Sequence, residues 1–360
     1  ASTLPDNLLA NSPNYTLSFM QIKTDKILKL IRALDINKSH GFDQISAIMV
    51  QLCDLSIVKP LSIIFKNALK EGTFPAPWKK ANVTPIHKKG SRNDINNYRP
   101  ISVLPICGKI FEKILYDTLY IYFEENNIFD VNQSGFRTGD SCINQLISIT
   151  NDIFKSFDKS PSTEVRGTFL DISKAFDRVW HDGVLFKLKL NGVSGEILKI
   201  FESFLNNRFQ RVVLNGQSSS WQSIKSGVPQ GSILGPLIFL IYINDISNGL
   251  KSNVKLFADD TSILSVVLDP NISANILNDD LKKIQQWAFQ WKMNFNSDPS
   301  KQAKEVIFSK KLSKPNHPNL YFNNLIIGKI PARKHLYLTL AEKLKFNLHL
   351  KMLLIRLLNL

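Results

Sequence analysis

The sequence predicts an α+β fold, because helical segments and segments typical of strands are interleaved without the strict alternation of a doubly wound sheet. The chain has 360 residues, 44% of them hydrophobic, which is enough for a sizeable core and excludes wholesale disorder. It contains no internal repeat and no low-complexity tract. We therefore expect a globular chain with two or three lobes.

The first half of the chain reads as mainly helical, with one hairpin. Residues 1–14 form a polar leader, and Thr24-Asp25 is the start signal of a helix that has Ile27 and Ile31 on one face. Two short β-prone pieces flank the basic, turn-rich stretch 87–92, which predicts a hairpin. The further predicted elements are a helix over 61–69 that stops at Gly72, strands around 83–86 and 101–104, and a helix over 109–125.

The second half contains more strands. Residues 165–172 predict a buried strand, because they are apolar until a single carboxylate near the end. Asn215-Gly216 is the strongest two-residue hairpin signal in the chain. The other predicted elements are helices over 173–190, 194–207, 231–247 and 271–293, two strands within 254–267 folded about Ala258-Asp259-Asp260, and strands over 304–310 and 320–327.

The charge balance points to a polyanionic partner. There are 45 Lys and Arg residues against 30 Asp and Glu residues, which gives a net charge of +15. Such a surplus favours nucleic acid first and an anionic membrane surface second.

Cysteine usage and hydropathy indicate an intracellular chain that is not secreted. Cys53, Cys107 and Cys142 stand far apart, which excludes a disulfide framework and a zinc site of ordinary spacing, and we expect buried free thiols. The longest apolar run, 233–243, is too short to cross a bilayer. Because the first residue is Ala1, we expect a piece cut from a longer chain.

Three acidic residues stand at the ends of apolar, β-prone segments. Asp259 and Asp260 lie at the centre of a predicted hairpin, and Asp171 ends a predicted buried strand. If the strands are neighbours, the carboxylates converge at one edge of a sheet, where oxygen ligands suit Mg²⁺ and two such ions serve in-line phosphoryl transfer. Taken alone, the Asp-Asp pair is equally explained by a solvated turn.

Three segments in this order resemble the palm motifs of reverse transcriptases, namely 171–177, 226–232 and 257–260. The flanking stretches 97–102, 133–137 and 290–311 sharpen the resemblance to the jockey-like, non-long-terminal-repeat retrotransposon branch, over about residues 15–340. The resemblance implies a right-hand polymerase fold with fingers over 15–160 and an antiparallel palm sheet flanked by helices over 161–340. It also implies a largely missing thumb that begins at 341–360.

The resemblance implies a nucleotidyltransferase that copies an RNA template into DNA. A DNA primer or target DNA and dNTPs would be its other partners, with no membrane involved, and two Mg²⁺ ions, replaceable by Mn²⁺, its cofactors. Such a protein would work in the nucleus during integration. The implied site residues are Asp171, Asp259 and Asp260 for the metals, Phe176, Gln230 and Gly231 for the nucleotide, Lys89, Arg99 and Arg137 for phosphate or template, and Lys301 for the leaving pyrophosphate.

Two alternatives remain open. One is a catalytically dead RNA-binding relic, and the other an RNA-templated RNA polymerase, which Phe176 disfavours because a bulky ring at that position blocks a 2′ hydroxyl. The chain also departs from the resemblance, which has Gly at the position of Tyr337 and an acid at that of Ala341. In the family the hairpin at 335–338 supports the primer strand, so we expect the added Tyr337 ring and the missing thumb to give weak, distributive synthesis.

Overall fold

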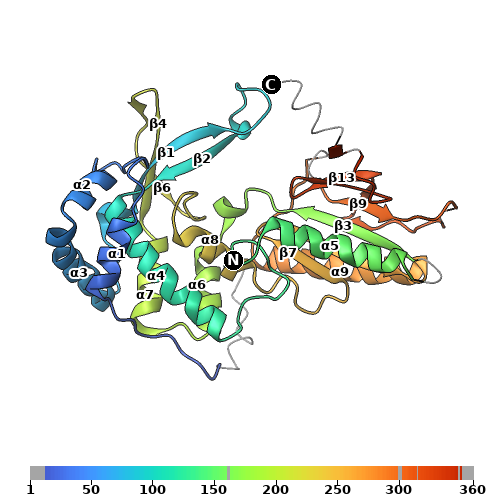
Figure 1. The fold of residues 1–360 in the computed structure, drawn as a ribbon, viewed down its shortest axis with the longest axis horizontal. Coiled ribbons are helices and arrows are strands. Elements are labelled where there is room, and N and C mark those ends of the chain that lie inside the picture. The colour runs from blue at the N-terminus through green and yellow to red at the C-terminus, as the bar shows by residue number, and fades with distance from the viewer. Residues whose placement is uncertain (1–12, 160–162, 299–301, 314, 348, 351–360) are drawn as a thin grey trace. The chain divides into compact units, whose positions relative to one another are not determined.

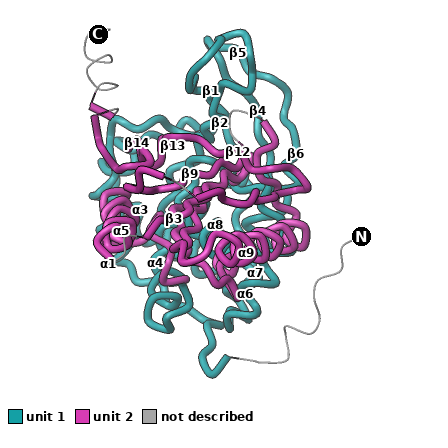
Figure 2. Tube along the Cα trace, turned by 90° about the vertical axis from the view of Figure 1, so that its right-hand side faces the viewer, with its two compact units in different colours: residues 1–129, 176–243 teal, residues 130–175, 244–360 magenta. Residues whose placement is uncertain are grey.

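A computed structural model describes residues 13–159, 163–298, 302–313, 315–347 and 349–350, and its mixture of helices and strands agrees with the predicted α+β class (Figure 1). The chain divides into two compact units, each made of two separate stretches (Figure 2). Unit 1 comprises residues 1–129 and 176–243, and unit 2 comprises residues 130–175 and 244–360.

Unit 1 contains one helix that is almost wholly buried. Every residue of α8 (Leu234–Ile243) except Pro236 is buried, so the longest apolar run of the sequence is the centre of a core. Within the described residues, no helix is both long and apolar enough to span a membrane. The other helices are α1 (Thr24–Arg32), α2 (Ala47–Leu52), α3 (Asp54–Glu71), α4 (Ile106–Glu125), α6 (His181–Leu190) and α7 (Gly195–Leu205), with short 3-10 helices at Ala76–Lys79, Ile95–Asn97 and Ala175–Arg178.

The sheet of unit 1 contains the predicted hairpins. β1 (Lys80–His87) pairs antiparallel with β2 (Tyr98–Val103) and parallel with β4 (Arg208–Leu214). β4 also pairs antiparallel with β5 (Gln217–Ser218) and β6 (Gln222–Ile224). Between β4 and β5, Asn215 and Gly216 have φ values of 50° and 77°, the positive angles that a two-residue hairpin turn requires.

Unit 2 is built on a five-stranded sheet in the order β12-β9-β3-β8-β7, with β3 at its centre. β3 pairs antiparallel with both of its neighbours. The strands are β3 (Glu164–Asp171), β7 (Asn253–Phe257), β8 (Asp260–Val267), β9 (Lys304–Phe308) and β12 (Gly328–Lys329), and the hairpin strands β10 (Tyr321–Phe322), β11 (Leu325–Ile326), β13 (Ala332–His335) and β14 (Leu338–Ala341) lie outside this sheet.

The two faces of this sheet are covered differently. Side chains of α5 (Cys142–Phe157) join Phe169 of β3 and Leu340 of β14 in one hydrophobic cluster. On the alternate face, Ser265 of β8 lies 3.3 Å from Ser273 of α9 (Pro270–Gln290), oxygen to oxygen. That face also buries the ion pair Arg166–Glu305, whose Nε and Oε1 are 2.5 Å apart.

Several sequence expectations need correction. The segment 320–327 is a short β10–β11 hairpin, not one strand, and the helix expected over 173–190 begins only at α6. α2 and α5 were not predicted. Of the three cysteines, all free, only Cys107 is buried. Tyr337 lies at the β13–β14 turn with φ 72° and is 79% exposed.

Candidate active site

The three predicted acids lie at one end of the central strands of unit 2. Asp171 is the last residue of β3 and is directly opposite Asp260, the first residue of β8, in the antiparallel register. Asp259 precedes it in the β7–β8 turn, where Ala258 has φ 53°. The strands that carry the acids are therefore neighbours, which is the condition under which the three carboxylates were expected to converge.

The charges in this cluster influence one another. Burial, reinforced by the charges of Asp259 and Asp171, raises the pKa of Asp260 to about 7, and the charge of Arg333 opposes this increase. Asp171 is anchored by Asn296, whose Nδ2 donates to Asp171 Oδ2 at 2.7 Å and whose backbone N–H donates to the Asp171 carbonyl at 2.9 Å. A positive charge close to these carboxylates reduces their mutual repulsion.

The donor set of the acids suits a divalent cation. Hard cations such as Mg²⁺ and Mn²⁺ prefer carboxylate oxygens, and burial together with the charges of Asp259 and Asp171 makes the ionised form of Asp260 unfavourable. Among the described residues, however, no three His, Cys, Asp or Glu side chains are grouped closely enough to hold a metal ion together. Asp171, Asp259 and Asp260 thus provide suitable chemistry without a preassembled set of ligands.

A glutamine braces the turn that carries the acids. Gln133 Oε1 accepts hydrogen bonds from the backbone N–H groups of Gly135, at 2.7 Å, and Ala258, at 2.9 Å. A Cβ on Gly135 would lie 2.2 Å from the Ala258 nitrogen, so only glycine fits there. Gln133 belongs to the stretch 133–137, but no pattern in the sequence indicates this role.

The residues predicted to contact the nucleotide gather in unit 1. The segment 226–231 is tied to the segment after Asp171, because Val228 donates from its backbone to the Phe176 carbonyl at 2.9 Å. The Phe176 ring stacks on Phe239, with centroids 5.0 Å apart. Gln230 Nε2 donates to Asp177 Oδ1 at 3.0 Å, so Asp177, which sequence reasoning did not single out, orients this glutamine.

Gly231 shows why a glycine is needed beside Gln230. Its φ is 125°, and a Cβ there would lie 2.4 Å from the carbonyl oxygen of Ser102. The same backbone approach lets Ser102 donate to the Gln230 carbonyl at 2.7 Å. His181 is buried, and its Nε2 lies 2.8 Å from the Gly227 carbonyl oxygen.

The predicted cations are spread over both units. In unit 1, Arg99 is exposed on β2 opposite Ile86, and Lys89 is exposed in the loop that follows β1. In unit 2, Arg137 is half-buried, with Nη1 3.4 Å from the Asp130 carbonyl oxygen. Lys301 lies outside the described residues.

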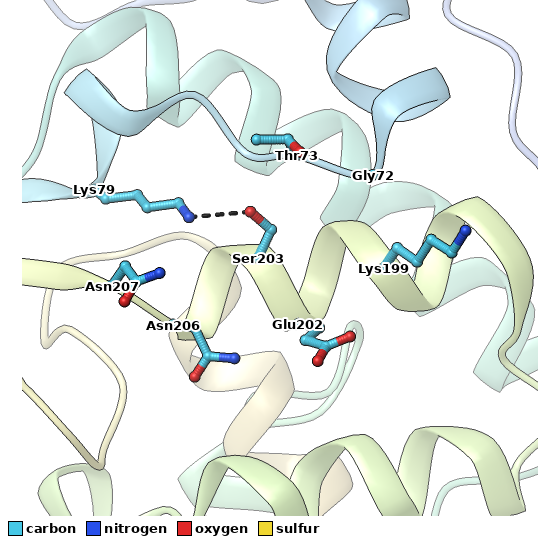
Figure 3. Close-up of a pocket in the computed structure, with 8 residues that line it drawn as sticks. All are labelled: Gly72, Thr73, Lys79, Lys199, Glu202, Ser203, Asn206 and Asn207. Atoms are coloured by element: carbon cyan, nitrogen blue, oxygen red, sulfur yellow. Dashed lines mark hydrogen bonds between the residues drawn. The ribbon is translucent and has the colours of Figure 1, made fainter.

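An open pocket of about 430 Å³ lies elsewhere in unit 1 (Figure 3). Its wall includes Lys79, whose ammonium donates to Ser203 Oγ at 3.0 Å and whose pKa is lowered by burial and by the charge of Arg208. None of the residues predicted for catalysis or nucleotide binding lines this pocket.

Comparisons with known proteins complete the description. Residues 86–312 match the family model described as reverse transcriptase (RNA-dependent DNA polymerase). The chain is 30% identical over 344 residues to the RNA-directed DNA polymerase from mobile element jockey of Drosophila melanogaster, covering 93% of this chain and 37% of that protein. It is 29% identical over 345 residues to a probable RNA-directed DNA polymerase from transposon BS of the same organism, covering 93% and 37%. The chain thus spans little more than a third of the length of these relatives.

A solved structure, apo telomerase from Candida tropicalis truncated from its C-terminal domain, is similar with a TM-score of 0.47 and 13% sequence identity. The similarity covers 76% of this chain and 58% of that one.

Proposed function

The chain belongs to the reverse transcriptase family, and on that premise we propose that it adds dNTPs to a primer 3′ hydroxyl on an RNA template by two-metal-ion phosphoryl transfer. The observation that carries this proposal is the placement of Asp171 directly opposite Asp260, because it joins two acids that are far apart in the sequence. Their neighbour Asp259 adds a third carboxylate.

The proposed architecture is a right hand with fingers over 15–160, a palm over 161–340 and the start of a thumb over 341–360. The antiparallel pairing of β3 with β8 and β9, with α5 and α9 packed on the sheet, supports the palm. The β1–β2 hairpin, which carries Lys89 and Arg99 at and near its loop, supports the fingers.

In this proposal Asp171 and Asp259 hold both metals, and Asp260 completes the acidic cluster. When bound, two divalent cations would lower the pKa of the primer hydroxyl and neutralise the negative charge of the leaving pyrophosphate. Asn296 keeps the Asp171 carboxylate in place through its 2.7 Å hydrogen bond. Gln133 keeps the turn that bears Asp259 in one conformation.

Phe176 and Gln230 are proposed to form the nucleotide-recognition surface of unit 1. The ring of Phe176 is half-buried and stacks on Phe239, and in this proposal its remaining surface contacts the sugar and blocks a 2′ hydroxyl. Asp177 orients Gln230, and Gly231 allows the backbone to approach closely. Arg99, Lys89 and Arg137 supply positive charge for phosphate or template.

Primer extension on an RNA template tests the proposal, with dNTPs or rNTPs and with Mg²⁺, Mn²⁺ or chelator. Asp259→Asn should abolish extension while RNA affinity stays within about twofold, because the phosphate contacts that release counterions lie elsewhere. Asp279→Asn, at an exposed position on α9, is the matched control and should extend normally. Extension by Asp259→Asn at the wild-type rate would refute the assignment. RNA binding without extension by any form would favour a dead relic.

Sugar selection is tested separately. Phe176→Ala should lower the ratio of kcat/KM for dNTP over rNTP by at least about tenfold, because the ring no longer blocks the 2′ hydroxyl. A preference for rNTPs in the unmodified chain would favour an RNA-templated RNA polymerase. An unchanged ratio would mean that Phe176 only packs against Phe239.

The relatives' names identify mobile elements, so target DNA is the proposed source of the primer. Action on target DNA also implies an intracellular location, with work in the nucleus during integration.

A further inference from the structure

The β13–β14 hairpin packs on the face of the unit 2 sheet that bears the acids. In β3, Phe169 and Asp171 are two residues apart and therefore point to the same face, and their partners in β8 are Ser262 and Asp260. His335 of β13 lies against this face, with its ring 5.1 Å from that of Phe169 and its Nε2 3.4 Å from Ser262 Oγ.

Arg333 is two residues before His335 and points to the same side of β13. Its guanidinium carbon lies 5.5 Å from the centroid of the Phe169 ring. Its Nε is buried and has no hydrogen-bond partner, so the position of the guanidinium is not explained by a hydrogen bond from that atom. Asp171 lies two residues beyond Phe169 on the same face of β3, with Asp260 opposite it, and the charges of both act on this guanidinium.

We propose that Arg333 is the built-in counter-ion of Asp171 and Asp260, which balances these carboxylates without metal and sets how tightly they take up a divalent cation. Two carboxylates in opposite register at a partly buried strand end repel each other, and a nearby guanidinium reduces that repulsion. The electrostatic influence is mutual, because burial lowers the pKa of Arg333 while the charges of Asp260 and Asp171 raise it. The identity of the cation rests on the proposed function, whereas the electrostatic coupling of Arg333 to the two carboxylates does not.

The same argument predicts competition. A divalent cation supplies the positive charge that Arg333 otherwise provides, so the metal and the guanidinium repel each other at one site. Removing the guanidinium charge should therefore tighten metal binding and destabilise the metal-free protein. A residue that only packed on Phe169 would produce no such opposite effects.

Metal binding without nucleic acid or nucleotide is the first test. The probe is Mn²⁺, whose free concentration is read by electron paramagnetic resonance in a titration of the whole chain. Arg333→Gln should lower the Mn²⁺ dissociation constant by about tenfold or more, whereas Arg333→Lys should stay within about threefold of wild type. Lys334→Gln is the matched control, because Lys334 is exposed on the same strand with its ammonium 5.6 Å from the Tyr337 ring centroid. Unchanged or weaker binding by Arg333→Gln would overturn the proposal.

A stability cycle in chelator covers the case in which Arg333→Gln folds poorly. The urea midpoint is measured for wild type, Arg333→Gln, Asp260→Asn and the double variant. Arg333→Gln should lower the midpoint in the wild-type background and change it much less in the Asp260→Asn background, because one of the two balanced charges is already gone. Additive effects would overturn the proposal. Since neither test measures polymerisation, an inactive chain that shows the coupling would refute the proposed function alone.

Discussion

Protonation of His335 should destabilise unit 2 as the pH falls, and the substitution His335→Gln should remove this effect. Its side chain is 5% exposed, and burial together with the charge of Arg333 lowers its pKa to about 4. Because this pKa is below the ordinary value for histidine, the unfolded chain binds the proton more readily than the folded one. The stabilisation from a neutral His335 is therefore fully present above about pH 6.5 and is lost as the pH falls towards 4.

The magnitude follows from the size of the shift. Each pH unit between the two pKa values costs about 1.4 kcal/mol, so the free energy of unfolding should fall by about 1.3 kcal/mol between pH 7.5 and 5.5 from this residue alone. The loss reaches about 3 kcal/mol once the pH is below both pKa values.

Urea unfolding followed by circular dichroism at pH 7.5 and 5.5 measures this loss. His335→Gln stays neutral and should show a pH-dependent loss smaller than that of wild type by about 1.3 kcal/mol. His40→Gln removes an exposed histidine and should behave like wild type. Equal pH dependence in wild type and His335→Gln would refute the reasoning, because protonation of His335 would then cost nothing.

Three further predictions concern backbone conformation and buried charge. Tyr337→Gly should raise the free energy of unfolding by about 1 kcal/mol in thermal unfolding, because the positive φ of 72° strains any residue with a Cβ. Tyr337→Ala keeps the Cβ and should therefore gain little. Gly231→Ala should lower the free energy of unfolding by well over the roughly 1 kcal/mol expected for Gly139→Ala, because of these two glycines only Gly231 would bring its added Cβ against backbone atoms. Equal shifts of the urea midpoint in the two variants would contradict the close approach at Gly231. Arg166→Met should cost about 3–5 kcal/mol in urea unfolding by stranding Glu305, and the double variant Arg166→Met/Glu305→Leu should recover most of it, whereas additive losses would mean that the pair is not coupled.

Most strands and the hairpins could be predicted because their signals are local. The strand 165–172 ends in one carboxylate, and the turn at Asn215-Gly216 needs only its own two residues. α5 was missed because Cys142–Phe157 is rich in β-branched residues, which have low helix propensity. Its one local signal was Ser141, which caps the helix by accepting from the Asn144 N–H at 3.2 Å.

The candidate site was predictable only in its acids. The sequence pattern predicts that Asp171 and Asp260 lie at the ends of strands. The register of β3 and β8 places the two residues opposite each other. The contact of Gln133 with Ala258, and the placement of Arg333 beside the acids, join segments that are distant in the sequence. No periodicity or turn signal reports such contacts, because they depend on tertiary packing.

The division of each compact unit between two stretches of chain has a consequence for biosynthesis. A ribosome releases β1 long before β4, its parallel neighbour, and makes α5 and β3 of the other unit in between. At about 5–20 residues per second, the nascent chain carries an unfinished core for several seconds, until α8 emerges. Apolar surface that is later buried on α8 is then open to chaperones and to aggregation. Any fragment that stops before Ile243 should therefore behave as a folding intermediate and not as an independent domain.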